Sequence, residues 1–188
     1  MEKTPPSGIR KFFEMLIGHD DVISLSVGEP DFPTPWCIRE EAFYHLEKGH
    51  TSYTSNWGLI ELREEISKYM TRYNLHYNPK DEILITVGAS EGVDAALRGI
   101  LNEGDEIIVS QPCYVNYVPL AELCRVKVVP VDTSVNGYYP TAEQIEKAIT
   151  PKTKALMICS PNNPTGTMIP KDELAKIAEI VKKHQIWV

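Results

Sequence analysis

The sequence predicts an α/β protein with a mostly parallel, doubly wound sheet that carries helices on both faces. From residue 82 onward, short apolar runs of strand length alternate with longer segments whose apolar residues recur at helical spacing. This alternation is typical of parallel strands joined by crossover helices. The composition, 43% hydrophobic and 24% charged over 188 residues, is ordinary for a globular protein with a sizeable core.

The residues before the alternating region are predicted to form three helices and one strand. Apolar residues at helical spacing predict a short helix over residues 7–17, and an alternating run predicts a strand over residues 22–26. A turn-rich segment then leads into a helix over residues 34–48, for which Thr34 is the expected N-cap. The third helix is predicted over residues 59–73, because its apolar positions trace one face.

The alternating region contains four predicted strands and four predicted helices. The strands are expected at residues 82–87, 106–110, 126–131 and 155–159. The helices are expected at residues 90–101, 114–124, 141–149 and 171–184. Thr141 and Gln144 have the spacing of a capping box at the start of the third helix. A further strand is expected to begin at Ile186.

Charge and cysteine usage exclude several function classes. The net charge of −7 argues against a nucleic-acid surface and against binding to an anionic membrane. No apolar run is long enough to span a bilayer, and the first ten residues lack the apolar core of a secretory signal. The four cysteines and five histidines show no metal-ligand spacing, and Cys159 is expected to be a core thiol. We therefore expect a reduced, cytoplasmic protein without a metal.

Small residues join the predicted strand at 82–87 to the helix that follows it. The first N–H groups of a helix have no partner within the helix, and the helix dipole favours an anion beside them. Gly88, Ala89 and Ser90 would let a phosphate approach this end closely. The chain has neither the G-x-G-x-x-G nor the P-loop pattern, so dinucleotide and P-loop functions lose support.

The segment S-P-N-N-P-T-G at residues 160–166 follows the predicted strand at 155–159. A rigid polar turn at the carboxyl end of a strand lies where open α/β sheets bind ligands. The segment resembles the Asn-Pro-Thr-Gly signature of class I/II aminotransferases, the aspartate aminotransferase-like pyridoxal-phosphate (PLP) enzymes of fold type I. The segments G-E-P-D-F-P-T-P, Y-T-S-N-W-G-L-I-E-L-R-E, V-G-A-S-E-G and Q-P-C-Y-V-N-Y precede it in the family's order. The resemblance covers residues 7–188.

The resemblance implies a domain plan and an activity. Residues 1–48 would form an N-terminal arm and a segment of the small domain, and residues 49–188 the first half of the PLP-binding large domain. The family implies a homodimer that uses pyridoxal 5'-phosphate to move an amino group between an amino acid and a 2-oxo acid. The amino donor is not defined by this sequence.

The resemblance also assigns roles to residues that bind the cofactor. Gly88, Ala89 and Ser90 match the turn that cradles the phosphate of PLP. Tyr114 matches the aromatic residue that stacks on the pyridine ring, and Asn163 the asparagine that donates to its phenolic oxygen. The simpler alternatives are a core aromatic for Tyr114 and a turn residue for Asn163.

Two further matches lie in the N-terminal part of the chain. Tyr53 resembles the tyrosine that reaches the phosphate in the neighbouring subunit. Gly28 matches the glycine whose backbone approaches the substrate carboxylate, although a simple turn before Pro30 is an equal alternative.

Several family residues have no match in the 188 residues. The Schiff-base lysine, the aspartate on the pyridine nitrogen and the arginine for the substrate carboxylate lie later in the family's sequence. The lysines after residue 170 belong to one predicted helix and are best explained as its solvated face. We therefore expect an N-terminal fragment that has no catalytic residue of its own and is inactive alone.

Other functions remain open at this point. A carbon–sulfur lyase shares the cofactor site. A truncated or split fragment, or the ligand-sensing domain of a regulator, would be non-catalytic, although the chain has no DNA-binding segment. A nucleotide-binding α/β domain lacks its glycine fingerprint here.

Overall fold

The computed structural model describes residues 14–15, 23, 28 and 30–188. This part of the chain divides into two units, one that ends at Thr86 and one that runs from Val87 to Val188. The helix predicted at residues 7–17 and the strand predicted at residues 22–26 lie largely outside the described residues. The domain boundary expected after residue 48 stays a prediction.

The unit from Val87 to Val188 is built on three parallel strands in the order β2-β1-β3. The central strand β1 (Glu106–Gln111) pairs on one side with β2 (Lys127–Asp132) and on the other with β3 (Thr153–Met157). Near the end of the chain, Trp187 forms a single parallel bridge with Ala155 on the free side of β3. The expected strand at Ile186 is therefore present as one bridge.

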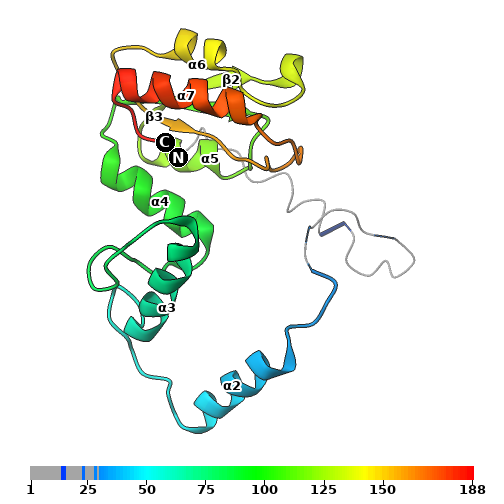
Figure 1. Ribbon diagram of the computed structural model, residues 1–188, viewed down its shortest axis with the longest axis vertical. Coiled ribbons are helices and arrows are strands. Elements are labelled where there is room, and N and C mark those ends of the chain that lie inside the picture. The colour runs from blue at the N-terminus through cyan, green and yellow to red at the C-terminus, as the bar shows by residue number, and fades with distance from the viewer. Residues whose placement is uncertain (1–13, 16–22, 24–27, 29) are drawn as a thin grey trace. The chain divides into compact units, whose positions relative to one another are not determined.

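Helices cover both faces of this sheet (Figure 1). On one face, α4 (Ala89–Ile100) and α5 (Tyr117–Leu123) pack against Ile107 and Val109 of β1. On the other face, α6 (Ala142–Ala148) and α7 (Lys171–His184) pack against Ile108. Successive side chains of a strand point to opposite faces, so β1, which is buried from Glu106 to Ser110, contributes side chains to both cores. The predicted doubly wound fold is confirmed.

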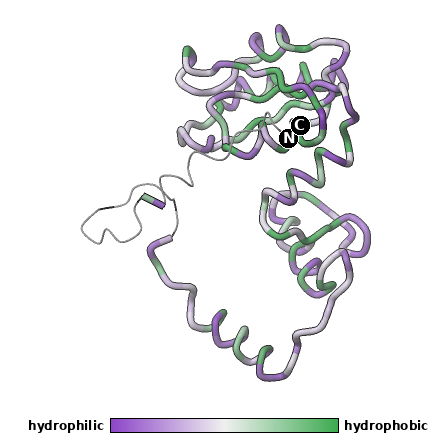
Figure 2. The backbone as a smooth tube through the Cα atoms, turned by 180° about the vertical axis from the view of Figure 1, so that it is seen from behind, coloured by the Kyte–Doolittle hydropathy of each residue, from purple (hydrophilic) through white to green (hydrophobic). Residues whose placement is uncertain are grey.

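Hydropathy follows the same plan along the chain. Figure 2 shows hydrophobic residues running through the strands of this unit, with hydrophilic stretches in the turns around them. The largest fully buried side chains are mostly β-branched, and they are Ile107, Ile108, Ile145, Val109 and Thr133. Branched residues of this kind favour strands and fill a core without flexible ends.

The unit that ends at Thr86 is mainly helical. It contains α2 (Trp36–Glu47), α3 (Ile60–Met70) and the 3-10 helix η1 (Thr71–Tyr73), while a second 3-10 helix, η2 (Ser134–Asn136), belongs to the other unit. Within this unit, Arg63 is 5% exposed, and its Nη1 donates to the carbonyls of Pro79 and Lys80. The buried Arg63 guanidinium thus links α3 by hydrogen bonds to the turn that contains Pro79 and Lys80.

Two predicted elements in this unit were wrong in detail. Residues 82–87 form no strand; within the described chain, the Ile85 N–H donates to the Trp57 carbonyl at 3.1 Å. The apolar run at these residues contains the buried Ile83, and the burial of a side chain does not require a partner strand. The N-cap of α2 is Pro35 and not Thr34, and no side chain caps the helix.

In the other unit, two predicted boundaries were wrong. The helix expected from residue 114 begins at Tyr117, because residues 114–117 form a turn in which the Tyr117 N–H donates to the Tyr114 carbonyl. The strand β3 ends at Met157, so Cys159 is not a strand core residue. Its half-buried thiol donates to the Pro161 carbonyl.

Other local signals predicted the structure closely. The helix α7 spans residues 171–184 as expected. The capping box of α6 is complete, because Thr141 Oγ1 accepts from the Gln144 N–H and Gln144 Oε1 accepts from the Thr141 N–H. Such reciprocal bonds satisfy donors that a helix start otherwise leaves unpaired.

Glu106 begins β1 as a buried carboxylate. Its Oε1 accepts a hydrogen bond from Lys127 Nζ at 2.8 Å, and its Oε2 accepts one from Thr150 Oγ1 at 2.6 Å. The ammonium of Lys127, followed by the hydroxyl of Thr150, holds the pKa of Glu106 below its ordinary value. These contacts join the amino ends of β1 and β2 to the turn before β3.

We expect Glu106→Gln to flatten the acid side of the pH dependence of stability. Because the pKa of Glu106 is lower in the folded state, the carboxylate stabilises the fold above its ordinary value of 4.5. That contribution is lost as the pH falls through the folded pKa. Urea unfolding at a series of pH values measures the slope. Glu103→Gln is the control, because the Glu103 side chain is 69% exposed; identical slopes in both variants would contradict the prediction.

Candidate functional site

The candidate site lies at the carboxyl edge of the sheet. Because the strands are parallel, the segments that follow β1 and β3 leave the sheet at the same edge. A hydrogen bond of 3.1 Å from Asn162 Nδ2 to the Pro112 carbonyl joins the two segments directly. Tyr114 and Asn163, which were predicted from separate motifs, therefore lie on neighbouring loops.

The start of α4 provides the second component of the site. Gly88 is the N-cap of this 12-residue helix and has φ +83°, a conformation that side-chain-bearing residues rarely adopt. Ala89 is the first helical residue and is exposed, whereas Ser90 is half-buried. The Glu91 carboxylate turns back to accept a hydrogen bond from the Val87 N–H, so its charge is engaged on the chain itself. The helix start presents small residues, a hydroxyl and first-turn amides, as expected from the sequence.

Asn116 connects the start of α4 to the loop that carries Tyr114. Its Nδ2 donates to Ser90 Oγ at 3.1 Å and lies 3.5 Å from the Tyr114 hydroxyl. The three side chains are half-buried, and Ser90 lies 26 residues before Asn116 in the sequence. The structure thus brings together two of the predicted cofactor residues, Ser90 and Tyr114.

The surroundings of Tyr114 are aromatic and uncharged. Its ring meets that of Tyr117 edge to face, with centroids 5.6 Å apart and an interplanar angle of 75°. Burial, followed by a hydrogen bond with the Cys159 thiol, raises the pKa of Tyr117. Burial also raises the pKa of the Cys113 thiol. These groups stay neutral at neutral pH and leave Tyr114 in a neutral setting suited to stacking.

The loop after β3 is closed by its own hydrogen bonds. Asn162 is 9% exposed, and its Nδ2 also donates to Thr165 Oγ1 at 2.8 Å. Its backbone bonds to Thr167 and Gly166 across the same turn. Asn163 is exposed on this framework and precedes a cis Pro164; Gln111-Pro112 and Ser160-Pro161 are also cis. The buried Asn162 therefore holds the loop in place, and the adjacent Asn163, which was predicted to bind a ligand, is exposed on it.

Two predicted site residues are not brought to this cluster. Tyr53 belongs to the unit that ends at Thr86, and its side chain is fully exposed there. Gly28 is exposed, and a Cβ built on it would meet no described atom within 4 Å. Their roles stay predictions.

The donor set of the cluster fits an anionic, flat ligand such as the predicted cofactor. A phosphate accepts hydrogen bonds and does not donate them when fully ionised, and helix amides with the Ser90 hydroxyl are donors. The half-buried Tyr114 provides a ring for stacking, and Asn163 an exposed amide. Within the residues that the structure describes, no group of three or more His, Cys, Asp or Glu side chains could hold a metal ion.

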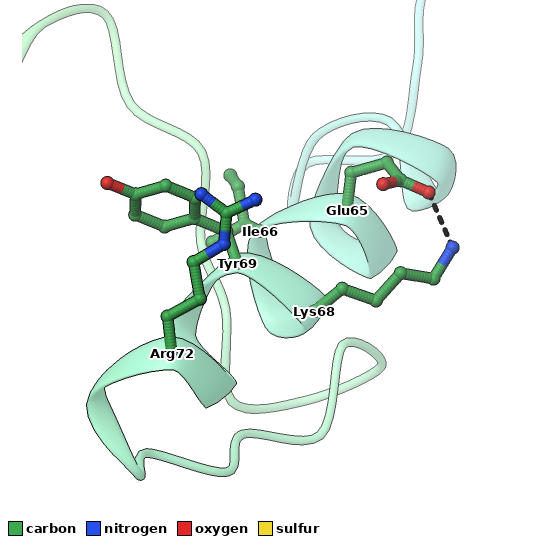
Figure 3. A pocket seen from close by; sticks show the side chains of 5 residues that line it. All are labelled: Glu65, Ile66, Lys68, Tyr69 and Arg72. Atoms are coloured by element: carbon green, nitrogen blue, oxygen red, sulfur yellow. Dashed lines mark hydrogen bonds and ion pairs between the residues drawn. The ribbon is translucent and has the colours of Figure 1, made fainter.

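A separate shallow pocket of about 400 Å³ lies on α3 and η1. Figure 3 shows the Arg72 guanidinium over the Tyr69 ring and Lys68 paired with Glu65. Lys68 Nζ lies 2.5 Å from Glu65 Oε1, and this hydrogen bond raises the pKa of Lys68. The pocket's ammonium group is already paired and none of the predicted site residues lines it, so we do not assign the site here.

Sequence reasoning missed Asn116 and Asn162. Both lie inside motifs of the family, Q-P-C-Y-V-N-Y and S-P-N-N-P-T-G, in which the family resemblance assigns roles only to Tyr114 and Asn163. A polar amide two positions from the aromatic residue, and a second asparagine in the turn, were the available signals. Neither signal shows that the amide groups bond to Ser90 and Pro112, 26 and 50 residues away.

Comparison with known proteins agrees with this arrangement. The chain is 50% identical over 190 residues to the putative aminotransferase YugH of Bacillus subtilis, a match that covers 100% of the chain and 49% of the relative. It is 44% identical over 183 residues to a probable N-acetyl-LL-diaminopimelate aminotransferase of the same bacterium, covering 97% of the chain and 47% of the relative. The chain therefore spans about half the length of the curated relatives it matches.

Solved structures show the same fold. A crystal structure of a Pyrococcus protein superposes with a TM-score of 0.91 at 39% identity, covering 98% of this chain and 48% of the other. A mutant of Thermus thermophilus aspartate aminotransferase gives 0.88 at 36% identity, covering 98% and 50%. The model of the family described as "Aminotransferase class I and II" matches residues 20–188. With the sheet-edge cluster, the parallel fold and these matches in agreement, the chain belongs to the class I and II aminotransferases.

Proposed function

We propose that this chain forms the cofactor-binding part of a PLP-dependent aminotransferase that moves an amino group between an amino acid and a 2-oxo acid. The observation that carries the proposal is the convergence of three segments at one sheet edge. Asn116 joins the start of α4 to the loop after β1, and Asn162 joins that loop to the loop after β3. The family membership supports the same activity.

The residues at this edge have complementary roles in the proposal. Gly88, Ala89 and Ser90 hold the phosphate through backbone N–H groups and the hydroxyl. Tyr114 stacks on the cofactor ring and fixes its plane. Asn163 donates its amide N–H to the phenolic oxygen. When bound, PLP supplies the electron sink for breaking bonds at the α-carbon of an amino acid.

Assembly and location are further parts of the proposal. A homodimer would let Tyr53 of one subunit reach the phosphate held by the other, and its full exposure in this chain is compatible with that role. Gly28 would approach the substrate carboxylate. The four free cysteines accord with a reducing cytoplasm. Among the described helices, none is both long and apolar enough to cross a membrane.

The test uses a hybrid, called here the completed enzyme, in which residues 1–188 replace the matching half of the Bacillus subtilis relative. This chain is 50% identical to the half that it replaces, so we expect it to form the same interface with the remaining half of the relative. We expect the hybrid to bind PLP, with a visible absorbance band, and to transaminate. A folded hybrid that stays colourless in excess PLP would refute the proposal.

A matched pair of variants separates the contribution of this chain from that of the other half. Tyr114→Phe keeps a ring at the stacking position, whereas Tyr114→Ala removes it. Stacking on an aromatic side chain contributes about 1–3 kcal/mol per base in other proteins, so the alanine variant should bind PLP roughly tenfold or more weakly. The phenylalanine variant should bind within about threefold of the parent. Equal affinities for all three proteins, measured by absorbance titration, would show that Tyr114 is only a core aromatic.

A further inference from the structure

Asn116 departs from the usual behaviour of its position in the fold. It is the N-cap of α5, and its carbonyl accepts a hydrogen bond from the Leu120 N–H at 3.0 Å. An asparagine at this position commonly caps the helix by accepting from an amide of the first turn. Here the side chain makes no such bond and points instead to Ser90 and Tyr114. The backbone of Asn116 is helical, with φ −85° and ψ −15°, unlike the extended backbone of a residue whose side chain caps a helix, and its amide is directed to the proposed cofactor site.

The direction of the hydrogen bond between Asn116 and Ser90 has a chemical consequence. The amide nitrogen of asparagine is only a donor, so Ser90 Oγ must be the acceptor in this 3.1 Å contact. The hydroxyl hydrogen of Ser90 is then directed away from Asn116. It remains available to a second acceptor next to the first turn of α4, where the helix dipole favours an anion.

From this geometry we propose that Asn116 is a positioning residue, which orients the Ser90 hydroxyl as a donor to the phosphate of the cofactor. The inference rests on the proposed function. Asn116 itself does not touch the phosphate; it acts through Ser90. Its second contact, to the Tyr114 hydroxyl, is 3.5 Å long and is therefore much weaker than the contact with Ser90.

A double-mutant cycle in the completed enzyme tests the inference, with the apparent dissociation constant for PLP as the readout. Ser90→Ala should weaken binding roughly tenfold, as expected for the loss of a hydrogen bond to a charged group. Asn116→Ala should weaken it by a similar factor. The double variant should bind no more than about twofold more weakly than Ser90→Ala, because residues that act through one contact are not additive.

Pyridoxal, which lacks the phosphate, is the second probe. The inference expects its affinity to change by less than about twofold in either single variant, in contrast to PLP. Asn116→Asp should weaken PLP binding more than Asn116→Ala, because a carboxylate would accept the Ser90 hydroxyl and repel the phosphate. Asn102→Ala, at an exposed asparagine beyond the end of α4, controls for general effects of substitution.

Three results would overturn the inference while leaving the proposed function intact. These are PLP affinity unchanged in Asn116→Ala, losses that multiply in the double variant, and equal losses for PLP and pyridoxal. A parent hybrid that folds and does not bind PLP would overturn the proposed function, and the inference with it. Thermal unfolding of each variant shows whether a loss of affinity comes from a loss of fold.

Discussion

A polypeptide of residues 1–188 should show no transamination in the presence of PLP, whereas the completed enzyme should turn over. The family resemblance requires a lysine that holds the cofactor at the end of a strand. Lys127 is the first residue of β2 and Lys154 the second of β3, so both lie at the amino edge of the sheet. The candidate site lies at the carboxyl edge, beyond the opposite ends of these two strands.

The other lysines near the sheet do not supply this function. The four lysines on α7, Lys171, Lys176, Lys182 and Lys183, are exposed. All except Lys171 pair with acidic side chains. A group that is to bond covalently to the cofactor has to be held beside it, since positioning accounts for much of the barrier reduction. We therefore expect the loss to be complete within the sensitivity of a coupled assay for 2-oxo acid formation.

The control for this prediction is the completed enzyme, purified in parallel and assayed at the same PLP concentration. A second arm adds the remaining half of the Bacillus subtilis relative as a separate polypeptide. Activity that appears only in this arm would support the assignment of residues 1–188 as the cofactor-binding part. Turnover by the 188-residue polypeptide alone would disprove the prediction.

The adjacent residues Asn162 and Asn163 should give opposite results when each is replaced by alanine in the completed enzyme. Asn163 is exposed, and no side-chain hydrogen bond joins it to another described residue. Asn163→Ala should therefore change the free energy of unfolding by less than about 0.5 kcal/mol. If Asn163 has its proposed role, the variant should slow turnover about tenfold to a hundredfold, because it would lack a hydrogen bond to a charged oxygen of the cofactor.

Asn162→Ala should primarily lower stability. The side chain is buried and donates to the Pro112 carbonyl and to Thr165 Oγ1, and the substitution would remove both hydrogen bonds. Buried groups left unpaired cost about 1–3 kcal/mol each, so the melting temperature should fall by several degrees. Any effect of Asn162→Ala on turnover should be indirect, because the substitution changes the position of the loop that carries Asn163.

Thermal unfolding and steady-state kinetics on the two variants decide between the assignments. If Asn163→Ala lowers the melting temperature as much as Asn162→Ala and leaves turnover unchanged, then Asn163 is only a turn residue. The comparison is well matched, because the two substitutions remove the same atoms at neighbouring positions of one loop.

The sequence by itself determined the elements and the family. Helical spacing defined α7 and the capping box defined the start of α6, because these signals depend on residues a few positions apart. The parallel, doubly wound sheet was predicted from the alternation of short apolar runs with helical segments, and β1 is its central described strand. The motifs around Ser90, Tyr114 and Asn163 were also visible, because each occupies a contiguous stretch of sequence.

Only the tertiary structure decided how these pieces are joined. Residues 82–87 form an apolar run of strand length, but a strand requires a partner, and pairing depends on distant residues. The sequence places Asn116 inside a predicted helix, whereas the structure begins α5 one residue later and brings the Asn116 amide to Ser90, 26 residues earlier in the chain. Asn162 and Asn163 are identical as letters; the hydrogen bond to Pro112, formed where two parallel strands end together, buries one and leaves the other exposed.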